Sequence, residues 1–348
     1  MKIFSTIFFT ALVLANCSSL KQTKQPEKKQ PIVIQFIIDG LMKDAVETAI
    51  KAGAKNLKYF ADNGVVVDNA YSNSPVGRVK LPDGSEPWRG ASPPNIGMHT
   101  GTHVFENQNL DDIFLSAKRK NIRSVYVGGH TLYDVFTTAN FHYAAIIPDE
   151  KVVALGIKHI KEDGVRLVRL HLQEIRSSWK GPRSKTDSES KYIKAILNAD
   201  AQLGKLVAFL KNEGLWEDAY FVISADHGMG TLRKSNHLSE QLSSWKIYMN
   251  FYGPGVKKGS TIAYAESPDV ALMTNHFMRV QPLKGYTTEV EYLKNSKTTG
   301  VFLKHIFEGN SDEVYHPKWI KSYLDNNKSS PPNDYLHYRE AMIRFINE

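Results

Sequence analysis

The sequence predicts an α/β protein with a doubly wound, mostly parallel central sheet and helices on both faces. Three observations predict this fold class. Short β-branched and aromatic apolar runs alternate with segments of helical period along most of the chain. The run Pro31–Asp39 is almost continuously apolar, which is typical of a strand buried on both faces of a parallel sheet. Two such runs stop at an aspartate, Asp39 and Asp226, and ligands of open α/β sheets collect at the carboxyl ends of strands.

The expected strands are apolar runs bounded by glycine, proline or polar residues. The run Tyr220–Ile223 is mostly β-branched and aromatic, and it ends shortly before Asp226-His227-Gly228. In chain order, we expect strands at 31–39, 65–71, 122–128, 144–147, 165–172, 220–223 and 246–253.

The expected helices repeat apolar residues every three or four positions. Gly64 fits the carboxyl cap of the first helix, and Ser92 followed by Pro93 suits the amino-terminal cap and first position of another. Residues 72–90 are rich in proline, glycine and charge and predict an irregular loop. We expect helices at 44–63, from Ser92 onward, at 149–160, 189–210 and 267–278.

The first 30 residues differ from the rest. The apolar run Ile3–Ala15 is too short to span a bilayer comfortably and has the layout of a secretory signal. Leu14-Ala15-Asn16-Cys17 resembles a bacterial lipobox, although Asn16 stands where a small residue is usual. We therefore expect a signal peptide over residues 1–17 and a lipid anchor on Cys17. A polar, charged tether over residues 18–30 would connect the anchor to one domain at 31–348.

Composition restricts the partners. The anchor would make this an exported bacterial protein, held at a membrane and facing the periplasm or the cell surface. Cys17 is the only cysteine, so the folded part has no disulfide or thiolate chemistry. The net charge of +8 favours anionic substrates or surfaces. Basic and aromatic residues are not interleaved as nucleic-acid binding would require, so we expect no nucleic-acid polymer as a partner.

Carboxylates and imidazoles at strand ends suggest a metal site. His237 follows His227 by ten positions and is close enough in sequence to fold back over the same strand end. Asp226 with these two histidines would suit zinc or manganese. Asp-His-Gly alone would more often be a turn with surface histidines, but Asp39 at a second strand end supports the metal hypothesis.

A hydroxyl group completes the predicted site. Ser92 at a helix start would face free backbone amides and the positive end of the helix dipole. Metal coordination would lower the pKa of its hydroxyl and make it a nucleophile. Thr100 and Thr102 are the alternative nucleophiles.

The chain resembles the alkaline phosphatase superfamily, especially its type I phosphodiesterase and nucleotide pyrophosphatase branch, or its sulfatase-like branch. The resemblance depends on the order of Asp39, Ser92, Asp226-His227-Gly228 and His237 along the chain. The resemblance spans roughly Pro31–Met278. It implies that residues 31–348 are a three-layer α/β/α catalytic domain. It also implies divalent metal, zinc or alternatively manganese or calcium, bound as one or two ions. The implied ligands are Asp39, Ser92, Glu174, Asp226, His227 and His237, and Asn95 would help bind the phosphoryl oxygens.

Two departures from the family pattern concern the nucleophile and the second metal. The spacing to Thr100-Gly101 is one residue short, so an ungapped match would place Ala91 at the nucleophile. In the second-metal motif, Glu174 replaces an aspartate and Ser178 replaces a histidine. That site would be rebuilt from Glu174, His237 and His171, or the enzyme would use one metal. Arg176 would then offer a positive charge in place of the second cation.

The resemblance implies hydrolysis of a small anionic phosphate ester, more readily a diester than a monoester. A sulfatase and a phosphoalcohol transferase are the alternatives within the superfamily. Ile96 stands where sulfatases carry an arginine, and this disfavours the sulfatase. From a different class, the chain would be a non-catalytic surface-binding lipoprotein that kept the fold and lost a metal.

Overall fold

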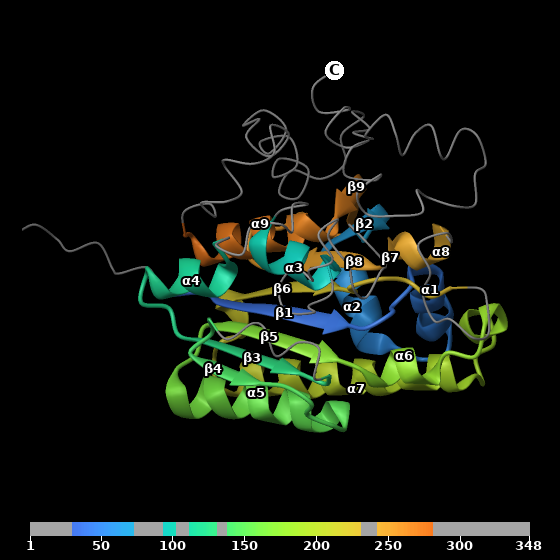
Figure 1. Cartoon of the computed structure of the whole chain (residues 1–348), viewed down its shortest axis with the longest axis horizontal. Helices are drawn as coiled ribbons and strands as arrows, with labels where there is room; N and C mark the ends of the chain where they lie inside the picture. The colour runs from blue at the N-terminus through green and yellow to red at the C-terminus, as the bar shows by residue number, and fades with distance from the viewer. Residues whose placement is uncertain (1–29, 73–92, 102–110, 131–137, 231–241, 281–348) are drawn as a thin grey trace, which may run out of the picture.

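The computed structural model describes residues 30–72, 93–101, 111–130, 138–230 and 242–280. Within them a mixed, mostly parallel nine-stranded sheet lies between two layers of helices (Figure 1), which confirms the predicted α/β class. Across the sheet the strands follow the order β4 (Phe141–Tyr143), β3 (Ser124–Gly128), β5 (Leu167–Leu172), β1 (Ile32–Ile38), β6 (Ala219–Ser224), β8 (Met249–Tyr252), β2 (Val65–Tyr71) and β7 (Lys246–Ile247), and β9 (Ser260–Glu266) also pairs with β2.

The centre of the sheet is parallel. β1 pairs in parallel with β5 on one side and with β6 on the other, and β3 and β4 continue the parallel order beyond β5. β8 is antiparallel to both β6 and β2. All seven residues of β1 are buried, because strands flank both edges of β1 and helices cover both faces of the sheet. This double burial explains the continuous apolar run in the sequence.

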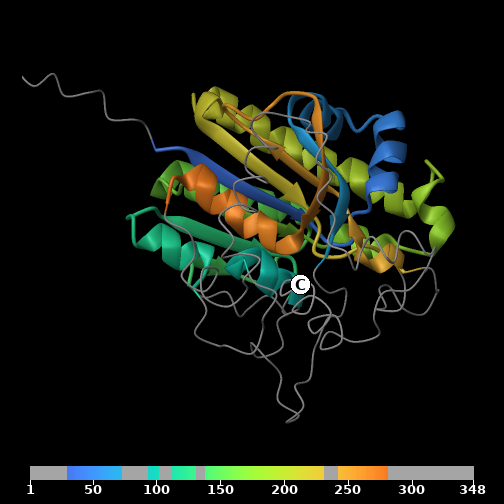
Figure 2. The same ribbon diagram turned by 90° about the horizontal axis from the view of Figure 1, so that it is seen from above.

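Helices cover the two faces of the sheet as separate layers (Figures 1 and 2). One layer consists of α3 (Pro93–Thr100), α4 (Ile113–Lys118) and α9 (Ser267–Met278). The other consists of α1 (Lys43–Lys51), α2 (Lys55–Asn63), α5 (Asp149–Asp163) and α7 (Lys191–Asn212). Two short helices, α6 (Glu174–Ser178) and α8 (Leu242–Trp245), lie near the carboxyl ends of the central strands. Short 3-10 turns occupy Pro182–Lys185 and Trp216–Asp218.

The structure corrects three of the predicted elements. The expected helix 44–63 is two helices, α1 and α2, separated at Gly53, whose φ of 113° is incompatible with a continuous helix. The strand expected at 144–147 lies at Phe141–Tyr143 instead, and Ala145 has a φ of 58°, which no extended strand allows. The expected strand 246–253 is divided into β7 and β8. Strand 65–71 and helix 267–278 are confirmed to the residue.

No helix in the described ranges has the length and apolar character needed to cross a membrane. The predicted signal peptide 1–17, the anchor at Cys17 and most of the tether lie outside the described residues, as does the segment 281–348. The extent of a single domain over 31–348 therefore stays a prediction.

Candidate metal centre

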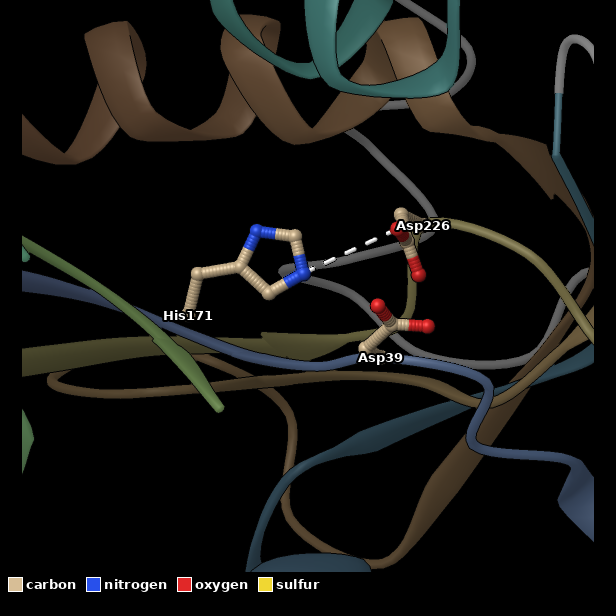
Figure 3. Close-up of side chains that lie close together, drawn as sticks. All are labelled: Asp39, His171 and Asp226. Atoms are coloured by element: carbon tan, nitrogen blue, oxygen red, sulfur yellow. Dashed lines mark ion pairs between the residues drawn. The ribbon is translucent and has the colours of Figure 1, made fainter. Parts of the chain in front are cut away.

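Three ligand-type side chains converge at the carboxyl edge of the sheet. Asp39 directly follows β1, Asp226 lies two residues after β6, and His171 is the penultimate residue of β5. In the parallel register, Ile37 of β1 is the partner of both His171 and Ser224, so the three strands end at the same level. One ligand atom from each of the three side chains lies within 4.8 Å of the other two (Figure 3).

His227 adds a second imidazole to this cluster. Its Nε2 lies 3.4 Å from Oδ1 of Asp39 and 3.7 Å from Oδ2 of Asp226. Its Nδ1 lies 2.8 Å from the carbonyl oxygen of Gly228. Because a carbonyl only accepts, Nδ1 carries a proton, and Nε2 is the ring nitrogen that faces the carboxylates. A metal-ligating histidine is oriented by such a second hydrogen bond.

The charges favour a cation at this position. The side chains of Asp39 and Asp226 are 0% and 1% exposed, and burying two neighbouring carboxylates is costly unless positive charge compensates them. Burial lowers the pKa of His171 to about 3, against the opposing effect of the Asp226 carboxylate, so its imidazole is neutral at pH 7. Two carboxylates and two imidazoles are a donor set that suits zinc or manganese.

Backbone and side-chain donors fix the Asp226 carboxylate. Oδ1 accepts from the backbone N–H of His227 at 3.0 Å and from that of Gly40 at 3.3 Å. Gly40 has a φ of 77°, a conformation that glycine adopts without strain. The Ser72 hydroxyl donates to the Asp226 carbonyl at 2.6 Å. The loop after β6 is thus tied to the turn after β1 and to the end of β2.

A buried polar network connects Asp226 with the interior of the sheet. Arg169 of β5 is fully buried and donates to Gln35 Oε1 and to Asn95 Oδ1, both at 2.7 Å. Because a guanidinium only donates, Asn95 must present its oxygen to Arg169, and its Nδ2 faces Oδ2 of Asp226 at 3.4 Å. The charged guanidinium therefore determines the orientation of the amide beside Asp226.

Several of the predicted site residues lie in or beside this cluster. Asp39, Asp226 and His227 come together, and Asn95 in the first turn of α3 contacts Asp226. α3 begins at Pro93, as predicted, whereas Ser92 and His237 lie outside the described residues.

Glu174 makes contacts away from the cluster. Its Oε1 accepts from the backbone N–H of Asp149 at 3.2 Å, and its Oε2 accepts from Asn198 Nδ2 at 2.9 Å. Ser178 donates its hydroxyl to the Glu174 carbonyl at 2.9 Å. Among the alternative nucleophiles, Thr100 donates to the carbonyl of Ile96 at 2.8 Å, and Thr102 lies outside the described residues.

Sequence reasoning gives His171 too little weight. A histidine between two leucines of a strand is more often a packed strand residue than a ligand, yet His171 is one of the three clustered side chains. A signal is present, because Arg169 and His171 are two positions apart in an apolar strand and so share one face of the sheet. The sequence order alone does not show that this strand is adjacent to β1.

A family model confirms part of the predicted resemblance. The model described as type I phosphodiesterase / nucleotide pyrophosphatase matches residues 152–318. A search of curated protein sequences found no significant match.

Solved structures share the fold. An inactive murine ectonucleotide pyrophosphatase / phosphodiesterase 5 in complex with AMP is 14% identical, with a TM-score of 0.56, covering 73% of this chain and 96% of that chain. A protein of glycosaminoglycan metabolism in Bacteroides thetaiotaomicron is 14% identical, with a TM-score of 0.59 and coverages of 83% and 79%. A protein in complex with its substrate D-glucosamine-2-N,6-O-disulfate is 12% identical, with a TM-score of 0.56 and coverages of 73% and 77%. With the family model, these matches confirm the resemblance to the alkaline phosphatase superfamily.

Proposed function

We propose that this protein is a metal-dependent hydrolase of phosphate esters, and of diesters in preference to monoesters. One observation carries the proposal: two buried carboxylates and an imidazole nitrogen converge at the carboxyl edge of the sheet, at Asp39, Asp226 and His227. The match to a phosphodiesterase and pyrophosphatase family model supports the reaction class.

Asp39, Asp226 and His227 would hold the metal, with His171 beside them. A divalent ion, zinc or alternatively manganese or calcium, supplies charge neutralisation and lowers the pKa of a nearby hydroxyl. Ser92 is the proposed nucleophile. Support for it comes from Asn95, three positions later in the chain, whose amide is hydrogen-bonded to Asp226 and so brings the first turn of α3 to the cluster.

The proposed reaction is in-line displacement. The Ser92 oxygen forms a bond to phosphorus as the bond to the leaving alcohol breaks, and water then cleaves the seryl ester. Pro93 and Pro94 have no N–H, so the backbone N–H of Asn95 and the positive end of the α3 dipole would stabilise negative charge on the phosphoryl oxygens. Asn95 would keep Asp226 in its orientation during both steps, through the contact described above.

The experiment is a substrate screen with the metal-loaded protein. Release of nitrophenol from bis(4-nitrophenyl) phosphate is compared with release from 4-nitrophenyl phosphate, with zinc, with manganese and after chelation. We expect metal-dependent turnover that is faster for the diester and lost in Ser92→Ala. No turnover of either ester by metal-loaded protein refutes the proposal. Full activity in Ser92→Ala refutes the nucleophile and directs attention to Thr102.

A sulfatase is the second candidate function. The specific observation is the shared fold with a protein that binds a disulfated glucosamine. Including 4-nitrophenyl sulfate in the screen separates the two, and preferential release from the sulfate ester would favour the sulfatase.

We also propose that the protein is exported and anchored by a lipid on Cys17. The lipobox-like Leu14-Ala15-Asn16-Cys17 supports this. Mass spectrometry of the protein from bacterial membranes tests it. A mature chain that begins with a lipid-modified Cys17 is expected, and an unmodified Met1 refutes the anchor.

A further inference from the structure

Arg176 is the cationic side chain of α6 that approaches the candidate metal centre. Its Nη1 lies 3.9 Å from Oδ2 of Asp39, a separation that allows an ion pair but is too long for a hydrogen bond. The Arg176 side chain is 25% exposed, whereas that of Asp39 is fully buried. Arg176 is therefore the partner of this pair that solvent, and an anion in solvent, can reach.

The helical phase of α6 explains why this residue faces the cluster. Successive residues of a helix are rotated by about 100°, so residues two positions apart differ by about 200°. Arg176 therefore points away from the side of α6 that carries Glu174 and Ser178. Their contacts agree, because Glu174 binds Asn198 of α7 and Ser178 binds the helix backbone. Glu174 thus links α6 to α7 and to the start of α5, whereas Ser178 bonds within its own helix.

An accessible cation would favour binding of an anionic ester. One divalent ion would neutralise the two carboxylates of Asp39 and Asp226. The Arg169 guanidinium adds a positive charge, but it is fully buried and already donates to Gln35 and Asn95. A guanidinium adds one positive charge that does not titrate at physiological pH. Its planar array of donors matches two oxygens of a tetrahedral anion such as a phosphoryl group.

We propose that Arg176 is the anion-binding residue of this site, that it binds the phosphoryl oxygens of the substrate, and that the site holds one divalent cation. This inference rests on the proposed function, since it concerns the same cluster. It replaces the expectation that Glu174 contributes to a second metal ion.

The test is a calorimetric titration of inorganic phosphate into the protein. The protein is first loaded with metal and then dialysed to remove excess metal. Arg176→Met and Arg176→Lys are compared with wild type. Arg183→Met serves as the matched control, because it removes an exposed positive charge seven positions along the chain. Metal content per chain is measured by mass spectrometry for each protein, and circular dichroism verifies folding.

We expect Arg176→Met to weaken phosphate binding by about 10- to 100-fold, the range for hydrogen bonds to a charged group. Arg176→Lys should lose less, Arg183→Met should bind as wild type, and every protein should hold one metal equivalent. Wild-type affinity in Arg176→Met, no phosphate binding by wild type, or two metal equivalents in wild type would each overturn the inference.

Turnover of bis(4-nitrophenyl) phosphate, measured on the same samples, separates this inference from the proposed function. Turnover together with unchanged phosphate affinity in Arg176→Met overturns the role of Arg176 and retains the hydrolase. Arg176-dependent phosphate binding without turnover of any ester retains the role of Arg176 and refutes the hydrolase.

Discussion

Replacing Asp226 by asparagine should have opposite effects on the metal-free and the metal-loaded protein. The carboxylates of Asp39 and Asp226 are buried side by side, so without metal they repel each other. The asparagine side chain introduced by Asp226→Asn would be close in size and would keep Oδ1 as the acceptor for the backbone N–H groups of Gly40 and His227. The substitution therefore removes charge while most of the local hydrogen bonding persists.

The expected magnitude follows from the geometry. The ligand atoms lie within 4.8 Å of one another. At that upper limit of separation, an effective dielectric constant of about 20 gives a repulsion between the two carboxylates of roughly 3 kcal/mol. The new amide nitrogen would face Nδ2 of Asn95, and losing that hydrogen bond costs about 1 kcal/mol. A net stabilisation of about 2 kcal/mol remains, which for a domain of this size raises the Tm by about 4 to 8 °C.

The assay is thermal unfolding of wild type and Asp226→Asn, each after chelation and again with zinc at a concentration well above its Kd. Ligand at about 100 times Kd stabilises a folded protein by about 2.7 kcal/mol. Wild type should gain stability from zinc, whereas the variant should gain little and should lose turnover. A lower Tm of the metal-free variant, or a zinc response equal to that of wild type, would refute the electrostatic reasoning and the ligand role.

Three further predictions concern residues around the site. Glu174→Gln should leave metal content unchanged in metal analysis. It should lower the free energy of unfolding in urea by about 1 kcal/mol, because the Glu174 carboxylate accepts hydrogen bonds from Asn198 and Asp149. Loss of a metal equivalent would contradict this. Gly228→Ala should destabilise the fold by about 1 to 3 kcal/mol, since the new Cβ would lie 2.1 Å from the Ser243 carbonyl oxygen. It should also weaken zinc binding in calorimetry. Wild-type stability and zinc affinity in this variant would show that the loop moves freely. Burial raises the pKa of Asp149 to about 6 from 3.8. The stability that the Asp149 proton contributes is complete below pH 3.8 and is lost as the pH rises through about 6. In urea titrations between pH 4 and pH 7, the free energy of unfolding of wild type should therefore fall by up to about 3 kcal/mol relative to that of Asp149→Asn. A pH-independent difference would exclude Asp149 as the source.

Much of the fold could be predicted because burial imposes a recognisable pattern. The apolar run Pro31–Asp39 predicted a strand buried on both faces, and β1 has that environment. The period of 267–278 predicted α9 to the residue. Predictions were wrong where a single backbone angle decided the outcome, as at Gly53. The helical spacing of apolar residues continues on both sides of Gly53, so it does not reveal that the positive φ there divides the helix.

For the candidate site, the chemically distinctive residues were recognisable one by one. Asp39, Asp226 and His227 each follow a strand, and that position can be read along the chain. Whether Glu174 or Arg176 faces the cluster could not be read, because it depends on the rotation of a five-residue helix that packs against α7. His171 was equally ambiguous until the strand order placed β5 beside β1.

By itself the sequence determined which segments become strands and helices and which of them end in metal-binding side chains, because hydrophobic period and turn residues act locally. Only the tertiary structure decided which strand ends are neighbours and which side of α6 faces them. Strand order and helix rotation arise from packing between segments that lie far apart in the chain, and no local pattern encodes that packing.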